Sequence, residues 1–135
     1  MIEDGAHIKI IDFGFSVLIN PSQKLKIFCG TPSYMAPELT QKREYDGKAV
    51  DMWALGVLLY VMLAGTFPFK GNSETELYSR IQRGNFNPPD HFSRDAKRVI
   101  SMLLEPNSKR RATAKDVRLL FPEILAHSRH LGEVH

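Results

Sequence analysis

The sequence predicts a mainly α-helical domain that begins with a short β-hairpin, and three observations support this prediction. A long apolar stretch over 49–64 has the length of a helix and not of a strand. Three further stretches carry helix-capping residues or apolar residues at helical spacing. Near the amino terminus, Asp4-Gly5 separates two short β-favouring segments, and this dipeptide accepts the positive φ of a tight hairpin turn.

The composition is that of one soluble domain. The chain has 135 residues, of which 43% are hydrophobic. The single Cys29 excludes an internal disulfide, and no stretch has the order of a secretory signal, so we expect the cytoplasm or the nucleus. The net charge is +3, and Lys and Arg are scattered apart from Lys109-Arg110-Arg111. This distribution argues against binding of nucleic acid.

The first third of the chain contains a hairpin and then a long loop. The second strand of the hairpin should lead into Asp12-Phe13-Gly14. From Phe15 to Thr40 neither a helical nor a strand period persists, so we predict a loop. Loops of this length in compact domains are usually functional or disordered. The part over 28–38 is rich in Gly and Pro, which favours an ordered conformation.

The central helix should begin near Asp46 or Gly47 and end at Gly65. After Asp51 it is apolar on nearly every side, which is typical of a helix surrounded by protein or by lipid. The apolar run is about 14 residues, whereas a bilayer needs roughly 20. We therefore predict a core helix and no membrane span.

The next predicted helix begins with a capping box and ends at a glycine. Ser73 and Glu76 have the spacing of the capping box, Leu77 and Ile81 share one face, and Gly84 can end the helix.

Two more helices follow in the second half of the chain. Ser93 should cap the first, which has a regular core-facing stripe and stops before Pro106. The stripe consists of Ala96, Val99, Ile100, Leu103 and Leu104. Thr113 and Asp116 should cap the second, which Pro122 breaks or kinks. Val117, Leu120 and Phe121 should face inward, and residues 127–135 are expected to form a tail.

Three motifs in a fixed order resemble those of eukaryotic protein kinases: Asp12-Phe13-Gly14, Ala36-Pro37-Glu38 and residues 51–56 (DMWALG). The resemblance extends over about 8–121, and it implies that residues 1–126 are part of a protein kinase domain. That fold is α+β overall, and this chain would supply the activation segment and the helices of the larger lobe. Residues 28–34 and 65–69 look most like serine/threonine kinases of the calmodulin-dependent group, near its AMP-activated and microtubule-affinity-regulating branch.

The resemblance implies a role for each matching residue around the phosphate-transfer site. Asp12 would bind Mg²⁺ against the phosphates of ATP, Phe13 would pack beneath the other lobe, and Gly14 would let the turn flip. Phe15 would favour serine over threonine as the acceptor. Thr31 would contact the catalytic aspartate and shape the groove for a protein substrate that carries a Ser or Thr hydroxyl.

The remaining matches imply structural roles. Glu38 and Arg111 would form a buried ion pair that ties the end of the loop to the late helices. Asp51 would accept backbone hydrogen bonds from the catalytic loop, and Trp53 would pack against the segment that ends in Glu38.

Two substitutions and one larger gap depart from the family pattern. Ile27 stands where relatives of this branch carry a phosphorylated threonine, and Val61 stands where some kinases carry a glutamate that reads arginine in the substrate. The glycine-rich loop, the lysine–glutamate pair and the His-Arg-Asp loop do not occur in these residues. We therefore expect the isolated chain to be inactive.

A second hypothesis is a catalytically dead half-domain that acts as a binding or scaffold module. Its contact surface would be the helical face around Leu77, Ile81 and Phe86. His127 and His130 lie three residues apart, but no Cys or carboxylate cluster completes a metal site, so we interpret them as tail residues. The sequence does not predict an oligomeric state.

Overall fold

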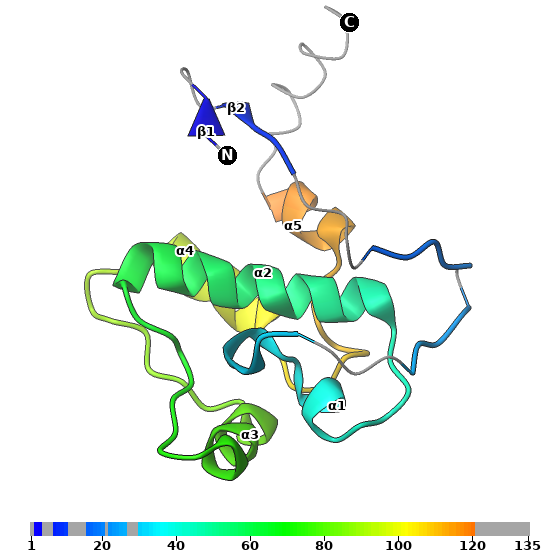
Figure 1. Ribbon diagram of the computed structural model, residues 1–135. Coiled ribbons are helices and arrows are strands. Elements are labelled where there is room, and N and C mark those ends of the chain that lie inside the picture. The colour runs from blue at the N-terminus through cyan, green and yellow to red at the C-terminus, as the bar shows by residue number, and fades with distance from the viewer. Residues whose placement is uncertain (1, 4–6, 11–15, 21, 27–29, 121–135) are drawn as a thin grey trace, which may run out of the picture.

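A computed structural model describes residues 2–3, 7–10, 16–20, 22–26 and 30–120 of the chain. Within these residues a two-stranded hairpin precedes a 3-10 turn and five α-helices, and the longest helix crosses the middle of the molecule (Figure 1). The elements in chain order are β1 (Ile2–Glu3), β2 (His7–Ile8), η1 (Pro32–Tyr34), α1 (Pro37–Thr40), α2 (Gly47–Ala64), α3 (Glu74–Arg83), α4 (Arg94–Leu103) and α5 (Ala114–Leu120).

The amino-terminal hairpin is present as predicted. β1 and β2 are antiparallel, with Ile2 opposite Ile8 and Glu3 opposite His7. The turn residues Asp4 and Gly5, on which the prediction rested, lie outside the described residues.

The prediction of an uninterrupted loop over 15–40 is wrong at its carboxyl end, where η1 and α1 form. Pro32 and Pro37 occupy the first turns of these two elements. Proline suits that position because its φ is already near the helical value and its missing N–H would have no partner there. Short helical turns begun by single prolines leave no periodic pattern, so the sequence pattern did not reveal them.

α2 has the predicted ends. The carboxylate of Asp46 accepts a hydrogen bond from the backbone N–H of Lys48 at 3.0 Å, and Gly65 ends the helix with φ 75°. Trp53 and Val57 are fully buried on its inner side. Gly56 allows α4 to approach closely, because a Cβ at this position would lie 2.7 Å from the Cβ of Leu103.

The outer side of α2 is exposed. Its four exposed large apolar side chains are Leu55 at 44%, Leu58 at 43%, Met62 at 65% and Leu63 at 44%. Among the described residues, α2 is the one helix long and apolar enough to cross a membrane by length and composition, with a mean hydropathy of 1.5. Core helices of soluble proteins meet the same criterion. The inner side of α2 packs on α4.

The capping predictions for the last three helices are confirmed. Ser73 Oγ accepts from the backbone N–H of Glu76 at 3.1 Å, and Gly84 ends α3 with φ 69°. Ser93 caps α4 in the same manner, again at 3.1 Å. At the start of α5, Thr113 and Asp116 each accept a hydrogen bond from the backbone N–H of the other, at 3.2 and 2.9 Å.

The core lies where α2 meets α4, η1 and the loops around α3. In Figure 1, α1 and α3 lie on one side of α2, and α5 lies on the other. Val99, Ile100, Leu103 and Leu104 of the predicted stripe are buried. Ala96, Val117 and Leu120 are half-buried, and Phe121 lies outside the described residues.

The surface proposed for a scaffold module is not a free surface. Ile81 is fully buried, and Leu77 and Phe86 pack against the same core cluster. Much of this helical face is therefore used by the core and is not available to a partner. The exposed apolar face belongs to α2 instead.

Candidate functional site

The most completely bonded side chain in the described structure is that of Arg111, which follows α4. Its two terminal nitrogens contact the Glu38 carboxylate side by side, with Nη1 2.6 Å from Oε1 and Nη2 3.1 Å from Oε2. Nη1 also donates to the carbonyl of Ala49 at 2.9 Å, Nη2 donates to that of Pro106 at 3.4 Å, and Nε donates to that of Glu105 at 2.9 Å. Five N–H donors thus have five acceptors, which makes burial of this cation tolerable.

This ion pair joins three segments that are far apart in the sequence. Glu38 lies in the first turn of α1, where an acid is favoured by the helix dipole. The Arg111 side chain is fully buried, and the Glu38 side chain is only 12% exposed. The carbonyl of Ala49 brings the first turn of α2 into the same network. The contact predicted between Glu38 and Arg111 is therefore present.

Trp53 provides the apolar floor beneath this pair. The guanidinium of Arg111 lies 5.1 Å from the centre of the indole ring, within the range of a cation–π interaction. On α2, Trp53 is fully buried and stacks on Phe69 with ring centres 5.7 Å apart. It shares the core with Ala36, as predicted for a residue that packs against the segment ending in Glu38.

The segment before α1 is held from two sides while its start stays accessible. Thr31 is exposed, and its carbonyl accepts from the backbone N–H of Tyr34 at 3.0 Å. The ring of Tyr34 meets Phe67 edge to face at 5.4 Å. From α3, the Tyr78 hydroxyl lies 3.5 Å from the sulfur of Met35. A hydroxyl at Thr31 is thus presented on a fixed turn.

Asp51 lies beside a cavity at the start of α2. This cavity of about 680 Å³ is also lined by Lys48, Met52 and residues 108–109 and 111–115. Among the described residues the Asp51 carboxylate has no hydrogen-bond or ion-pair partner. Although the residue is exposed overall, partial burial of its carboxyl raises the pKa above the usual value.

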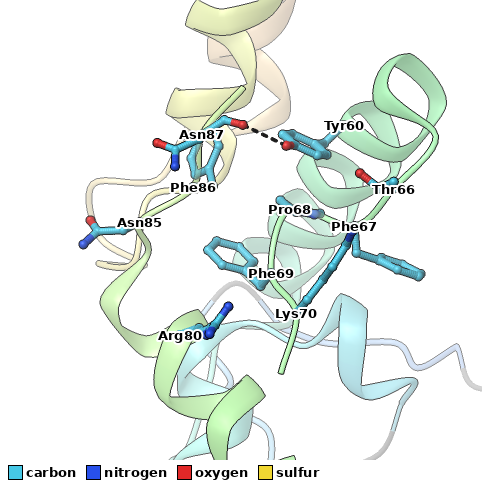
Figure 2. A pocket seen from close by; sticks show the side chains of 10 residues that line it. All are labelled: Tyr60, Thr66, Phe67, Pro68, Phe69, Lys70, Arg80, Asn85, Phe86 and Asn87. Atoms are coloured by element: carbon cyan, nitrogen blue, oxygen red, sulfur yellow. Dashed lines mark hydrogen bonds between the residues drawn. The ribbon is translucent and has the colours of Figure 1, made fainter. Parts of the chain in front are cut away.

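A third feature is a pocket of about 300 Å³ between the end of α2, α3 and the chain that follows α3 (Figure 2). At its back, the Tyr60 hydroxyl donates to the carbonyl of Asn87 at 3.0 Å. Burial raises the pKa of this hydroxyl. The sequence did not predict this pocket, because its lining comes from segments that only the fold brings together.

Several predicted site residues lie outside the described residues. These are Asp12, Phe13 and Gly14 of the first motif, together with Phe15 and Ile27. Their assigned roles therefore stay predictions. Within the described part of the chain, no group of three or more His, Cys, Asp or Glu side chains could hold a metal ion.

Comparison with known proteins identifies the family. The family model described as Protein kinase domain matches residues 1–126. The chain belongs to the protein kinase family. Residues 31–38 and Arg111 of this kinase chain lie within the matched range, so the Glu38–Arg111 pair is part of the kinase fold that the match covers.

Three curated relatives show how much of a kinase the chain represents. It is 39% identical over 117 residues to the probable serine/threonine-protein kinase MARK-A of Dictyostelium discoideum. It is 38% identical over 117 residues to sperm motility kinase Z of Mus musculus, and 38% over 120 residues to CBL-interacting protein kinase 19 of Oryza sativa subsp. japonica. Each alignment covers 87% of this kinase chain but only 11%, 24% and 24% of the relatives, respectively.

Proposed function

We propose that the chain is part of a serine/threonine protein kinase, which transfers the γ-phosphate of ATP to Ser or Thr hydroxyls of protein substrates. The observation that carries this proposal is the Glu38–Arg111 pair with its five acceptors. It anchors the carboxyl end of the segment 31–38, and Thr31 stands at the other end of this segment, where the turn η1 begins. A hydroxyl fixed in this way suits the orientation of a substrate peptide, on which phosphate transfer depends.

The proposal includes ATP and Mg²⁺ because protein kinases use both and because Asp12 is expected to bind the metal. A carboxylate is a suitable donor for Mg²⁺, which prefers oxygen ligands. Asp12 is the one metal-binding residue that we assign, and since it lies outside the described residues we derive no step through the metal or the nucleotide. The aspartate that would serve as the base is not among the 135 residues.

We further propose that these 135 residues alone do not transfer phosphate. Two observations support this part of the proposal. Asp51 has no partner among the described residues although it lines a cavity of about 680 Å³, and α2 carries exposed leucines. Both are expected where further chain of a kinase domain packs, and the relatives are four to nine times longer than the aligned part.

Radioactive ATP, Mg²⁺ and a peptide with one Ser acceptor test the activity. No incorporation above background is expected with the 135-residue chain. The longer translated product, if its coding sequence includes a His-Arg-Asp loop, should incorporate phosphate, and Asp12→Asn should abolish it. A preference for Ser over Thr is expected from Phe15. An active 135-residue chain would overturn the second proposal, and an inactive longer product that contains all the motifs would overturn the first.

We also propose the cytoplasm as the location, with the nucleus as the alternative, because the one cysteine fits a reducing compartment. Imaging of the tagged full-length product would test this.

The second candidate, a binding or scaffold module without catalysis, is favoured by one observation. Three leucines and a methionine are exposed together on α2. Exposed apolar faces of this kind mark contacts with other protein. The module should fold alone and melt cooperatively. Aggregation of the purified chain without a melting transition would rule it out.

A further inference from the structure

The pocket in Figure 2 combines an aromatic floor with a basic rim. The floor is formed by Tyr60, Phe69 and Phe86, and the rim carries the cations Lys70 and Arg80. Thr66, Asn85 and Asn87 add polar groups around the opening. No acidic residue occurs among the ten described residues that line the pocket. The lining therefore suits an anionic group next to an apolar one.

Neighbouring acids neutralise the rim only in part. In α3, Nη2 of Arg80 pairs with Oε1 of Glu76 at 2.6 Å. The other oxygen of Glu76 accepts from the backbone N–H of Asn72 at 2.8 Å, and Glu76 itself does not line the pocket. Among the described residues, no acid lies within ion-pair distance of Lys70. Lys70 thus stands at the opening as an uncompensated cation.

The floor is built before any ligand arrives. Phe86 meets both Tyr60 and Phe69 edge to face, with ring centres 6.1 Å apart in each case. The hydrogen bond from Tyr60 to the carbonyl of Asn87 fixes the chain that follows α3. A preformed pocket needs little ordering on binding, so even a short segment can bind measurably.

We propose that this pocket binds an acidic segment of a partner protein. A carboxylate of the segment lies between Lys70 and Arg80, and an adjacent apolar side chain rests on the ring of Phe86, the one aromatic of the floor that is not buried. Charge complementarity selects this occupant, because the lining offers cations, amides and aromatic rings but no carboxylate. The volume of about 300 Å³ suits one side chain and its neighbour and is small for a whole cofactor.

This inference goes beyond the proposed kinase activity and does not need it. Binding is measured with the full chain and a fluorescein-labelled peptide in which a phenylalanine is flanked by glutamates, without ATP. We expect saturable anisotropy with a Kd of about 10–100 μM, which weakens as salt rises. A peptide with glutamines in place of the glutamates should bind roughly tenfold more weakly.

Charge variants locate the site. Lys70→Glu should weaken binding of the acidic peptide roughly tenfold, and Arg80→Gln should weaken it by a smaller factor. Arg98→Glu is the matched control, because Arg98 is an exposed cation on α4 that does not line the pocket. It should leave the Kd within about twofold of the parent. Circular dichroism checks the folding of each variant, and Lys70→Ala replaces Lys70→Glu if the latter does not fold.

Four results would overturn the inference. The acidic peptide could fail to bind up to roughly millimolar concentration, or the glutamine peptide could bind equally well. The Lys70 variants could leave the Kd unchanged, or single-stranded RNA could compete better than the acidic peptide. A failed phosphate-transfer assay would overturn the proposed kinase activity alone, so the two failures are distinguishable.

Discussion

At the scale of single residues, Arg111 shows how a buried cation is made stable. Burial of a guanidinium costs free energy unless every N–H finds an acceptor and an opposite charge lies near. Here the Glu38 carboxylate and three carbonyls supply both conditions, and the Trp53 ring adds a cation–π contact. The pair therefore depends on both partners, and loss of one leaves the other charge buried.

The first prediction concerns this pair. Glu38→Gln should lower the free energy of unfolding by about 3 kcal/mol, because the guanidinium of Arg111 stays buried without its counter-charge. Chemical denaturation provides the measurement. Glu44→Gln is the matched control: Glu44 pairs with Lys26 at 3.0 Å, but these side chains are 56% and 75% exposed, so the loss should be below about 1 kcal/mol. Equal losses in the two variants would contradict the prediction.

The second prediction concerns Asp51. Because its pKa is raised in the folded chain, its charged form is disfavoured there, and folding gains stability as the pH falls through that pKa. Asp51→Asn should therefore stabilise the isolated chain at pH 7. After allowance for solvent screening, the gain should be at most about 0.5–1 kcal/mol. The gain should vanish well below the ordinary value of 3.8, where the carboxyl is neutral in both states. Thermal melts at both pH values measure it, and destabilisation at pH 7 would contradict it.

At the scale of elements, the helix ends fix where each helix stops. α2 and α3 both end at a glycine with positive φ, but only one of these glycines is also crowded. A Cβ on Gly65 would meet nothing within 4 Å, whereas a Cβ on Gly84 would lie 2.1 Å from Cγ of Pro106. The two positions separate the cost of backbone strain from the cost of a steric clash.

The third prediction compares these glycines. Gly65→Ala should cost about 1 kcal/mol, the strain of an L-residue in the left-handed region. Gly84→Ala should cost at least about 1 kcal/mol more, because the residue Pro106 is rigid and must move. Parallel urea titrations of the two variants measure both costs. A smaller loss at Gly84 than at Gly65 would show that Pro106 moves freely.

The fourth prediction concerns the start of α3 in acid. The hydrogen bond from the Asn72 N–H, followed by the charge and hydrogen bond of Arg80, lowers the pKa of Glu76 below its usual 4.5. A lowered pKa contributes stability that is present above 4.5 and is lost as the pH falls through the folded pKa. Glu76→Gln should therefore flatten the acid dependence of stability. The pKa of Asp116 at the start of α5 is lowered as well, by its hydrogen bonds with Thr113. Part of the acid dependence of stability should therefore remain in this variant. Chemical denaturation between neutral and acid pH measures the slope, and an unchanged slope would contradict the prediction.

At the scale of the whole molecule, the described structure covers only one side of its longest helix, α2. The inner side of α2 is packed, whereas its outer side exposes leucines and a methionine. Exposed apolar faces of this kind favour association with other protein. The chain spans only a small part of the length of the relatives it matches, which agrees with our proposal that other parts of a kinase domain pack on this face.

The fifth prediction tests this asymmetry in neighbouring residues. Val57 is fully buried and Leu58 is 43% exposed, although they are adjacent in α2. Leu58→Glu should reduce self-association of the chain in sedimentation and change the free energy of unfolding by less than about 0.5 kcal/mol. Val57→Glu should prevent cooperative folding, because it buries an unpaired charge. If Leu58→Glu also unfolds the chain, the face is not free in solution.

Local signals in the sequence were sufficient for most elements. Ser73, Ser93 and Thr113 cap their helices as predicted, and Asp46 caps α2 at its predicted start, because a cap is a contact between residues two or three positions apart. Val99, Ile100, Leu103 and Leu104 of the predicted stripe are buried for a similar reason, because helical spacing fixes which residues share a face. The turns at Pro32 and Pro37 escaped prediction because they are shorter than any period.

The sequence by itself determined the helices α2 to α5 and the residues that begin them, and its resemblance to protein kinases implied the partner of Glu38. Only the tertiary structure decided which side of α2 is covered, that Ile81 belongs to the core, and that Lys70 and Arg80 line the same aromatic pocket. The physical reason is the range of the interactions. Caps and helical stripes act within a few residues, whereas burial and pockets depend on which distant segments meet, and a helix that is apolar all round does not indicate which of its sides they cover.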